Sequence, residues 1–402
     1  MEQAFFRGNR RHLTEKLSGG LVVLAAYSPL QRQSDMTHTF MQEANFWWLT
    51  GIEAADWWLI IDGPRGKSWL AAPSVSRSHA IFDGSLSWEV ARTISGVDAV
   101  ISHDEADTLL RELSRKHSLV YTLGDDPYAK YYDFILNPGP KEMNKRLERI
   151  FSDVVDCRKE LANLRAHKQP AEIIAIKKAI NLTIDAFEIV KQKLPELRYE
   201  YEVEAEFSYY FRKHGSRGHA YEPIVAAGKN ACTLHYIDNN ARLKKRELLL
   251  LDIGASWQGY PADITRTYAL GEPTKRQMQV HGAVLSAQKA IINLLKPELA
   301  LEEYQRQVDR IMIEALLSLG LMTDADDQVH FEQYFPHAAS HGLGVDVHDS
   351  LGTTRYFQPD MVLTVEPGIY IPEEGIGVRI EDNILITSTG HTNLTARLGT
   401  SL

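Results

Sequence analysis

Short apolar runs alternate with stretches of helical spacing along the first 165 residues. The runs Gly20–Ala26, Trp57–Asp62 and Leu119–Gly124 are rich in residues that favour strands. Two further stretches, Asp104–Lys116 and Pro140–Phe151, repeat apolar residues with helical spacing. This alternation predicts a smaller α/β domain over residues 1–165.

The pattern changes after a charged stretch, Arg158–Lys168, which is followed by Pro170 and predicts the domain boundary. Strands and helices then alternate in longer blocks, with β-hairpins between the helices, which is an α+β pattern. Residues 166–402 therefore form the second predicted domain. Its predicted helices are Ala171–Leu194, Tyr201–His214, Thr274–Leu295 and Leu301–Leu319.

Composition excludes several classes of protein. The chain has 402 residues, 44% of them hydrophobic, and a formal net charge of −9 with scattered Lys and Arg, so nucleic acid is not an expected partner. No apolar run is long enough for a signal peptide or a membrane span, which predicts a soluble, cytoplasmic protein without a membrane partner. The two cysteines, Cys157 and Cys232, are widely separated and predict buried, reduced thiols.

Two aspartates stand near the mouth of a predicted hairpin. The apolar strand Leu248–Leu251 ends at Asp252, and Ala262–Ala269 returns as its partner, so that Asp252 and Asp263 are expected to face each other. Two adjacent buried carboxylates repel each other and need a shared proton or cation. An aspartate at a strand end is also a common turn cap, and the spacing alone leaves both interpretations open.

Two glutamates lie in the last apolar strands. Glu366 follows the predicted strand Met361–Val365, and Glu381 falls in the middle of what should be a core strand. A glutamate is rarely tolerated there without a partner. Arg379 could be that partner, although alternation along a strand also aims Arg379 and Glu381 at one face, where both could serve one site.

Histidines cluster in and before the segment SHGLGVDVHD, residues 340–349. His337, His341 and His348 lack the glutamate spacing of the H-E-x-x-H motif, and Gly342 and Gly344 do not complete a dinucleotide-binding loop. A lone histidine is more often a core residue than a ligand. The residues thus leave open whether this segment is an ordinary strand or one wall of a site.

The carboxylates and one imidazole together favour a dinuclear site for harder divalent cations, manganese or cobalt before a thiolate-bound zinc. Such a pair of cations can activate water and polarise a carbonyl group, as amide hydrolysis requires. A serine nucleophile is poorly supported, because Gly215-Ser216-Arg217-Gly218 does not have the spacing of the G-x-S-x-G motif.

Four motifs resemble the creatinase, aminopeptidase P and prolidase family, whose catalytic domain has the pita-bread fold. They are LLDIGASWQGYPADITRT, SHGLGVDVHD, VLTVEPGIYI and VRIEDNILIT, in this order. The stretch TFMQEANFWWLTGIE, residues 39–53, is similar to the N-terminal domain of aminopeptidase P and prolidase. The resemblance implies an α+β protein, with a C-terminal creatinase-like catalytic domain after the smaller N-terminal one.

The resemblance also implies the role of each site residue. Two divalent metal ions, manganese before cobalt or zinc, are expected on Asp252, Asp263, His341, Glu366 and Glu381. Glu366 would accept and pass on the proton of water. His348 would stabilise the oxyanion, His235 would contact the substrate, and His337 would flank the pocket for the residue after the cleaved bond.

The implied activity is hydrolysis of the bond before proline, either at the N-terminus of peptides or in Xaa-Pro dipeptides. Prolidases usually carry an arginine fourteen residues before the glutamate of V-E-P-G, where this chain has Gly352. Arg355 is nearby with a different spacing. An aminopeptidase that acts on longer peptides is therefore at least as well supported as a dipeptidase.

The alternative function is that of a non-peptidase family member, either a creatinase-like amidinohydrolase or a binding protein. A homodimer or homotetramer is also implied, because the family's N-terminal domain pairs subunits. The run Phe46-Trp47-Trp48 predicts a partly buried strand, from which Trp47 or Trp48 would line the entrance of the neighbouring active site.

Overall fold

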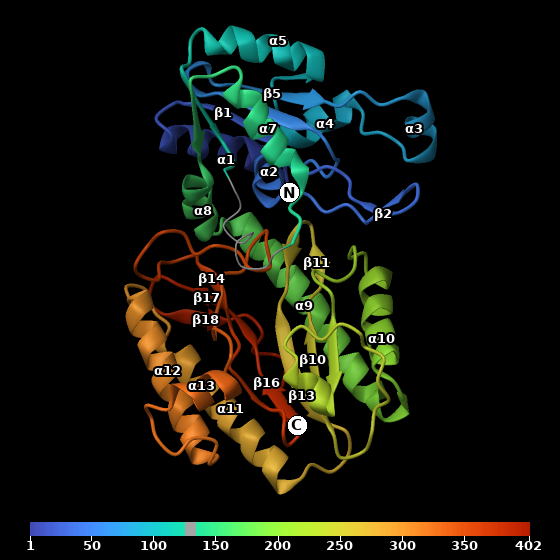
Figure 1. The fold of residues 1–402 in the computed structure, drawn as a ribbon, viewed down its shortest axis with the longest axis vertical. Coiled ribbons are helices and arrows are strands. Elements are labelled where there is room, and N and C mark those ends of the chain that lie inside the picture. Colours follow the sequence, from blue (N-terminus) through green and yellow to red (C-terminus); the bar gives the residue numbers. More distant parts are fainter. Residues whose placement is uncertain (125–133) are drawn as a thin grey trace. The chain divides into compact units, whose positions relative to one another are not determined.

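The computed structural model describes residues 1–124 and 134–402, which divide into two compact units, Met1–Leu164 and Arg165–Leu402. Figure 1 traces the helices and strands of both. Among the described residues, no helix combines the length and apolar character that crossing a membrane requires.

The N-terminal unit is built on a six-stranded mixed sheet with the strand order β6-β5-β4-β1-β7-β8. The pairs β1–β4 and β4–β5 are antiparallel, and the outer pairs are parallel. Apolar residues of the central strands pack against α5 and α7. The elements up to the end of this unit are α1 (Gln3–Lys16), β1 (Leu21–Ala25), β2 (Gln31–Gln33), β3 (Met36–Thr37), α2 (Ala44–Thr50), β4 (Trp58–Asp62), β5 (Lys67–Ala72), α3 (Arg77–Phe82), α4 (Trp88–Ser95), β6 (Ala99–Ser102), α5 (His103–Ser114), β7 (Leu119–Thr122), α7 (Pro138–Glu148), β8 (Asp153–Asp156) and α8 (Arg158–Ala166).

The aromatic run of this unit is helical, so the predicted strand is wrong. The side chain of Glu43 caps α2 by accepting from the backbone N–H of Phe46, and Gly51 ends the helix at φ 69°. Local capping thus overrides the strand preference of the aromatic residues. Trp47 and Trp48 are 6% and 1% exposed, which leaves them almost no surface with which to line a neighbour's entrance.

The second unit carries small antiparallel sheets flanked by long helices. Figure 1 shows the strands between α9 and α10 on one side and α11 and α12 on the other. The main sheets have the orders β13-β10-β9 and β14-β17-β18, with the separate pair β15-β16. Its elements are α9 (Pro170–Lys193), α10 (Glu200–Lys213), β9 (Ile224–Ala227), β10 (Leu248–Ile253), β11 (Ser256–Trp257), β12 (Tyr260–Pro261), β13 (Ile264–Ala269), α11 (Lys275–Leu294), α12 (Leu301–Ser318), α13 (Gln328–Tyr334), β14 (Val362–Val365), β15 (Gly368–Ile371), β16 (Ile376–Arg379), β17 (Asp382–Ile386) and β18 (His391–Asn393).

The mixed helix and strand content agrees with the predicted α+β class, but two details of the hairpins differ. In β10–β13, Asp252 is paired with Thr265. Asp263 therefore lies diagonally from Asp252, not opposite it. Glu381 lies in the break between β16 and β17, not within a strand, because the chain leaves one sheet at Arg379 and enters another at Asp382.

The segment 340–349 is a tight loop and not a strand. Gly342 forms isolated bridges to Asp349 and to Leu363, and residues 344–348 between them form bends. A Cβ atom on Gly342 would lie 2.3 Å from the carbonyl oxygen of Asp349, and one on Gly344 would lie 1.7 Å from its Oδ2. The two glycines let the loop close around Asp349.

Candidate metal centre

Four carboxylates and two imidazoles converge from separate elements of the second unit. Their ligand atoms form three overlapping groups, and within each group the atoms lie within 4.8 Å of one another. The groups share members, so together they form one cluster. The groups are Asp252, Asp263 and Glu381; His341, Glu366 and Glu381; and Asp263, His341 and His348.

The strand ends of the hairpin β10–β13 hold the two aspartates. Asp252 is 8% exposed and Asp263 is 5% exposed. The hydroxyl of Tyr221 lies 2.6 Å from Oδ1 of Asp252 and 2.7 Å from Oδ1 of Asp263. One hydroxyl proton can be donated to only one of them at a time. Burial raises the pKa of Asp263 to about 6, and the charge of Asp252 acts in the same direction, against the opposing effect of His341.

Glu381 gives the clearest sign of a missing partner. Its Oε2 accepts a hydrogen bond from the hydroxyl of Thr265 at 2.7 Å, whereas Oε1 is buried without a hydrogen-bond partner among the described residues. Burial, followed by the charges of Asp263 and Glu366, raises the pKa of Glu381 well above its ordinary value. A buried oxygen of this kind calls for a proton or a cation.

His341 links the two sides of the cluster. Its Nε2 lies 3.4 Å from Oδ2 of Asp263 and 3.2 Å from Oε1 of Glu366. Burial alone would lower the pKa of His341, but these two carboxylates raise it well above its ordinary value. Glu366 also accepts from the hydroxyl of Thr364 at 2.9 Å, and the hydrogen bond and charge of His341 outweigh burial and lower the pKa of Glu366 to about 2.

Arg379 serves the cluster through Asp252. Its NH2 group lies 2.5 Å from Oδ2 of Asp252, and its Nε donates to the hydroxyl of Thr265, which in turn donates to Glu381. Arg379 and Glu381 therefore reach one site, although through Thr265 and not through the strand alternation that was expected. The other arm of Arg379 donates to the hydroxyl of Tyr370.

The three accessory histidines occupy different positions. Nε2 of His337 lies 2.8 Å from the hydroxyl of Tyr370, and its Nδ1 lies 2.8 Å from the carbonyl oxygen of Ala338, so both ring nitrogens are engaged. His348 is exposed, with its ring centroid 4.2 Å from that of His341. Partial burial, followed by the charge of His341, lowers the pKa of His348, to which His235 also contributes. His235 itself is exposed.

The donor set fits divalent cations of harder character. It consists of carboxylate oxygens and imidazole nitrogens, without a thiol. Cys157 is buried and Cys232 is partly buried, and burial raises the pKa of both thiols, that of Cys232 to about 11. The buried free oxygen of Glu381 and the raised pKa of Asp263 are what oxygen ligands show when a cation is needed to offset their charge.

A buried ionic network anchors the loop that carries His341 and His348. NH2 of Arg165 lies 2.8 Å from Oδ1 of Asp349 and 2.6 Å from Oδ2 of Asp346. Nζ of Lys168 lies 3.3 Å from Oδ2 of Asp349, and the Lys168 side chain is fully buried. The sequence pattern indicated no role for these residues, although the charged stretch before Pro170 contains Arg165 and Lys168.

Two further residues near the cluster were missed, Tyr221 and Thr265. Neither stands in a spacing that would single it out, because each acts by touching a carboxylate from another element.

Gly352, at the position expected for a prolidase arginine, lies in a turn at φ 79°, and Arg355 is exposed.

Known proteins resemble both units. The chain matches the model of metallopeptidase family M24 over residues 174–388 and the aminopeptidase P N-terminal domain over residues 6–121. It is 32% identical over 416 residues to an Xaa-Pro aminopeptidase of Escherichia coli (strain K12), which covers 97% of this chain and 94% of the relative. Its fold is similar to aminopeptidase P from E. coli with the inhibitor Pro-Leu, at a TM-score of 0.86 and 30% identity over 100% of this chain and 96% of that one. The Zn-substituted E. coli enzyme in complex with product matches with the same TM-score, 0.86, at 29% identity and the same coverage, 100% and 96%.

Proposed function

Since this chain belongs to metallopeptidase family M24 and to its aminopeptidase P group, we propose that the cluster is an active site that cleaves peptides before proline. The chain is a peptidase of the Xaa-Pro type, and the non-peptidase alternative is not favoured. The observation that carries the assignment to this site is the buried oxygen of Glu381 that has no hydrogen-bond partner among the described residues and lies beside other carboxylates.

The proposed ligands are the five residues expected from the sequence, all within the stretch that matches the metallopeptidase model. Asp252, Asp263, His341, Glu366 and Glu381 would hold two divalent cations, with manganese proposed before cobalt or zinc. When bound, such cations supply a polarised carbonyl group and a water of lowered pKa. Without the cations, burial raises the pKa of Asp263 and of Glu381, so that protons bind to these carboxylates more readily.

Glu366 is the proposed proton carrier. Its ionised form can accept a proton from the attacking water and deliver it to the proline nitrogen as the peptide bond breaks. Thr364 and His341 hold its Oε1 in place at 2.9 Å and 3.2 Å, and Nδ1 of His337 lies 4.0 Å from its other oxygen. These contacts fix the direction in which the carboxylate presents its free lone pairs.

His348 and His235 are the proposed contacts to the substrate. The lowered pKa of His348 keeps its imidazole neutral near pH 7, so that it can donate an N–H to the oxygen that gains charge in the transition state. His337 has both ring nitrogens engaged, so it would flank the pocket for the residue after the cleaved bond through its ring surface.

The proposed substrates are peptides longer than two residues. Gly352 offers no side chain to hold the free carboxylate of a dipeptide. The E. coli relative, which aligns with this chain over 94% of the relative's length, is named an Xaa-Pro aminopeptidase. Arg355 is exposed four positions before Pro359 and is the nearest cation in the sequence that could take over this contact.

The decisive experiment compares Xaa-Pro dipeptides with Xaa-Pro-Yaa tripeptides of the same first residue. Metal-stripped protein is assayed with and without added manganese, beside the Asp263→Asn variant. Manganese-dependent cleavage of the tripeptide that the variant lacks would support the proposal, and equal activity of the variant would contradict the assigned site. Preference for the dipeptide would contradict the proposed substrate length.

A homodimer or homotetramer is also proposed, and light scattering on the active enzyme tests it. A fully active monomer would contradict this proposal. A cytoplasmic location stays a prediction, which fractionation of cells that express the chain would test.

A further inference from the structure

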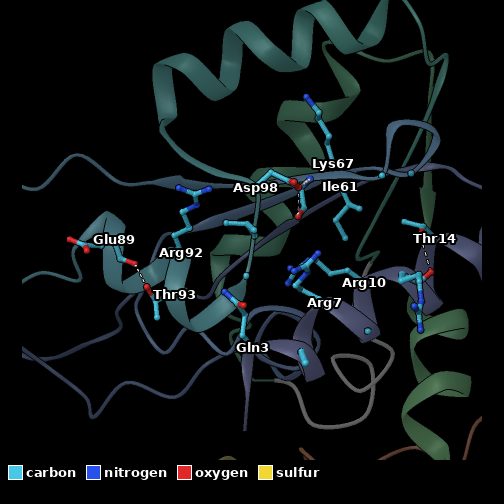
Figure 2. A pocket seen from close by; sticks show the side chains of 18 residues that line it. Gln3, Arg7, Arg10, Thr14, Ile61, Lys67, Glu89, Arg92, Thr93 and Asp98 are labelled. Carbon is cyan, nitrogen blue, oxygen red and sulfur yellow. Dashed lines mark hydrogen bonds between the residues drawn. The ribbon is translucent and has the colours of Figure 1, made fainter.

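A cavity of about 1000 Å³ lies within the N-terminal unit. One face of α1, Gly63 and Gly66 with the start of β5, and one face of α4 with the following loop form its walls. Figure 2 shows the charged side chains that line it, with Arg7 and Arg10 next to each other from α1. None of these residues belongs to the metal cluster.

Positive charge dominates the walls of this cavity. Five of its lining residues are cations and two are carboxylates. The cations are Arg7, Arg10, Arg11, Lys67 and Arg92, and the carboxylates are Glu89 and Asp98. This excess occurs in a chain with a formal net charge of −9, so the local charge is opposite to that of the whole molecule.

Among the described residues, the carboxylates of the cavity lie in no ion pair with its arginines, and Asp98 acts on Arg10 only from beyond ion-pair distance. Oδ2 of Asp98 accepts hydrogen bonds from the backbone N–H of Ser68 at 2.7 Å and from its hydroxyl at 3.3 Å. Within residues 1–124 and 134–402, Arg7, Arg92 and Lys67 lie in no ion pair. Their charges are therefore available to a ligand.

Arg10 adds a buried charge below these exposed ones. It is 4% exposed, and its guanidinium donates to the carbonyl oxygens of Leu49 at 2.6 Å and Ser95 at 2.9 Å. In the described part of the chain, no carboxylate lies within ion-pair distance of it. Burial, followed by the neighbouring charge of Arg7, lowers the pKa of Arg10 to about 10, and the charge of Asp98 offsets these effects only in part. A buried cation beside a like charge is unfavourable unless an anion offsets it.

The local backbone shapes the cavity around Arg7. Gly96 has φ 66°, and a Cβ atom there would lie 2.4 Å from Cγ of Gln3 and 2.9 Å from Cγ and Cδ of Arg7. The stem of Arg7 thus packs over a glycine and holds its guanidinium at the cavity. Ile61 and Val97, both buried, also line the cavity and add apolar surface.

We propose that this cavity binds a small organic anion that carries a phosphate group. Guanidinium groups match the geometry of phosphate oxygens with paired hydrogen bonds, and two exposed arginines above a buried one can offset a doubly charged group. The volume is in the range of small-molecule sites, and the apolar surface suits an organic part. This binding is independent of peptide hydrolysis.

Calorimetric titration of the metal-loaded protein with inorganic phosphate, at fixed ionic strength, tests this site. The variant Arg7→Gln/Arg92→Gln removes two exposed charges of the cavity. The matched control Arg111→Gln/Arg115→Gln removes two exposed charges from α5 and its end, which do not line the cavity. Because metal ions also bind phosphate, the comparison between the two variants is the decisive one.

The cavity variant is expected to bind phosphate at least about tenfold more weakly than wild type, since each lost charged hydrogen bond is worth about that factor. The control is expected to bind like wild type, and both should keep peptidase activity. Gln3→Glu, which adds a carboxylate to the cavity, should also weaken binding. Equal affinities of the two double variants, or no phosphate binding to wild type at millimolar concentrations, would overturn the proposal.

Discussion

The two units concentrate opposite charges in opposite ways. In the second unit, the carboxylates are buried and nearly every oxygen has a contact, whether to Tyr221, Thr265, Thr364 or Arg379. In the N-terminal unit, the cations around the cavity are mostly exposed, and only Arg10 is buried.

The two regions differ in the free energy that it costs to keep their charges out of water. A buried carboxylate must be paired, protonated or bound to a cation. The cluster can therefore be recognised from the buried oxygen of Glu381, which has no hydrogen-bond partner among the described residues. An exposed charge is already solvated, so the cavity is recognised only by its shape and by the sign of its charge. Variants of both units can test this contrast, and those that alter the buried cluster should lose the most.

Asp263→Asn should have the largest effect. Loss of one buried carboxylate removes a proposed ligand that touches both Tyr221 and His341, and hydrolysis of an Xaa-Pro-Yaa peptide should fall by at least about 10³-fold. Asp104→Asn, at an exposed position of α5, is the control and should retain wild-type kcat/KM. A decrease in kcat/KM of less than tenfold in Asp263→Asn would show that hydrolysis does not require this buried carboxylate.

Asp349→Asn should unfold the protein more easily, because it leaves the buried Lys168 without its anion and removes one of the two carboxylates that pair with Arg165. The free energy of unfolding should fall by about 3–5 kcal/mol, measured in denaturant. The exposed pair Arg397 and Asp185 supplies the control, since Asp185→Asn should cost at most about 1 kcal/mol.

The same variant separates stability from positioning. Under conditions where Asp349→Asn stays folded, kcat should fall by roughly 10–100-fold with a smaller change in KM, because the loop would no longer fix His341 and His348. An unchanged kcat would mean that the network supports only the fold.

Arg10→Met should have an intermediate effect on stability. It keeps the volume of the side chain but leaves the carbonyl oxygens of Leu49 and Ser95 without their donor, which should cost about 2–3 kcal/mol in thermal or chemical unfolding. Arg7→Gln, in the same cavity but exposed, should change stability by less than about 0.5 kcal/mol. Equal losses in the two variants would contradict the distinction between buried and exposed cations.

The smallest effect concerns pH. Burial lowers the pKa of His219 to about 4, so between pH 6.5 and 4 the unfolded chain binds a proton that the folded chain does not. The contribution of this residue to stability is therefore complete above pH 6.5 and declines as the pH falls, by roughly 1–2 kcal/mol between pH 7 and 5.

Unfolding of His219→Gln across this pH range checks the linkage. The variant should lose part of the pH dependence, whereas His330→Gln, at an exposed position, should keep it. A parallel decline in wild type and His219→Gln would assign the pH dependence to other groups.

The bounds of helices and strands were predicted best where the spacing of apolar side chains alone determines the type of element. The strands β1, β4 and β7 and the helices α9 and α12 lie within two residues of their predicted bounds, because apolar periodicity reports the face that packs. The helix α2 was missed because a single glutamate cap, Glu43, outweighed the aromatic residues that follow it.

The sequence indicated which carboxylates and histidines come together in the cluster, but not the contacts that support them. Carboxylates at strand ends carry a signal in the sequence, since burial makes them costly. Tyr221, Thr265 and Lys168 carry none, because each contributes through a neighbour that is distant in the sequence. The break at Glu381 was missed for a related reason, since only the fold shows that the chain changes sheets there.

The anchor between Lys168 and Asp349 spans 181 positions of the chain. During synthesis, the sheet of the N-terminal unit is complete once β8 has left the ribosome, whereas the loop of His341 cannot close on Lys168 until much later. At roughly 5–20 residues per second, Lys168 must wait about 10–40 s for the loop that carries Asp349. During that interval the nascent chain holds a folded first unit and a Lys168 without its Asp349 partner, so a chaperone would be expected to bind this enzyme at its second unit.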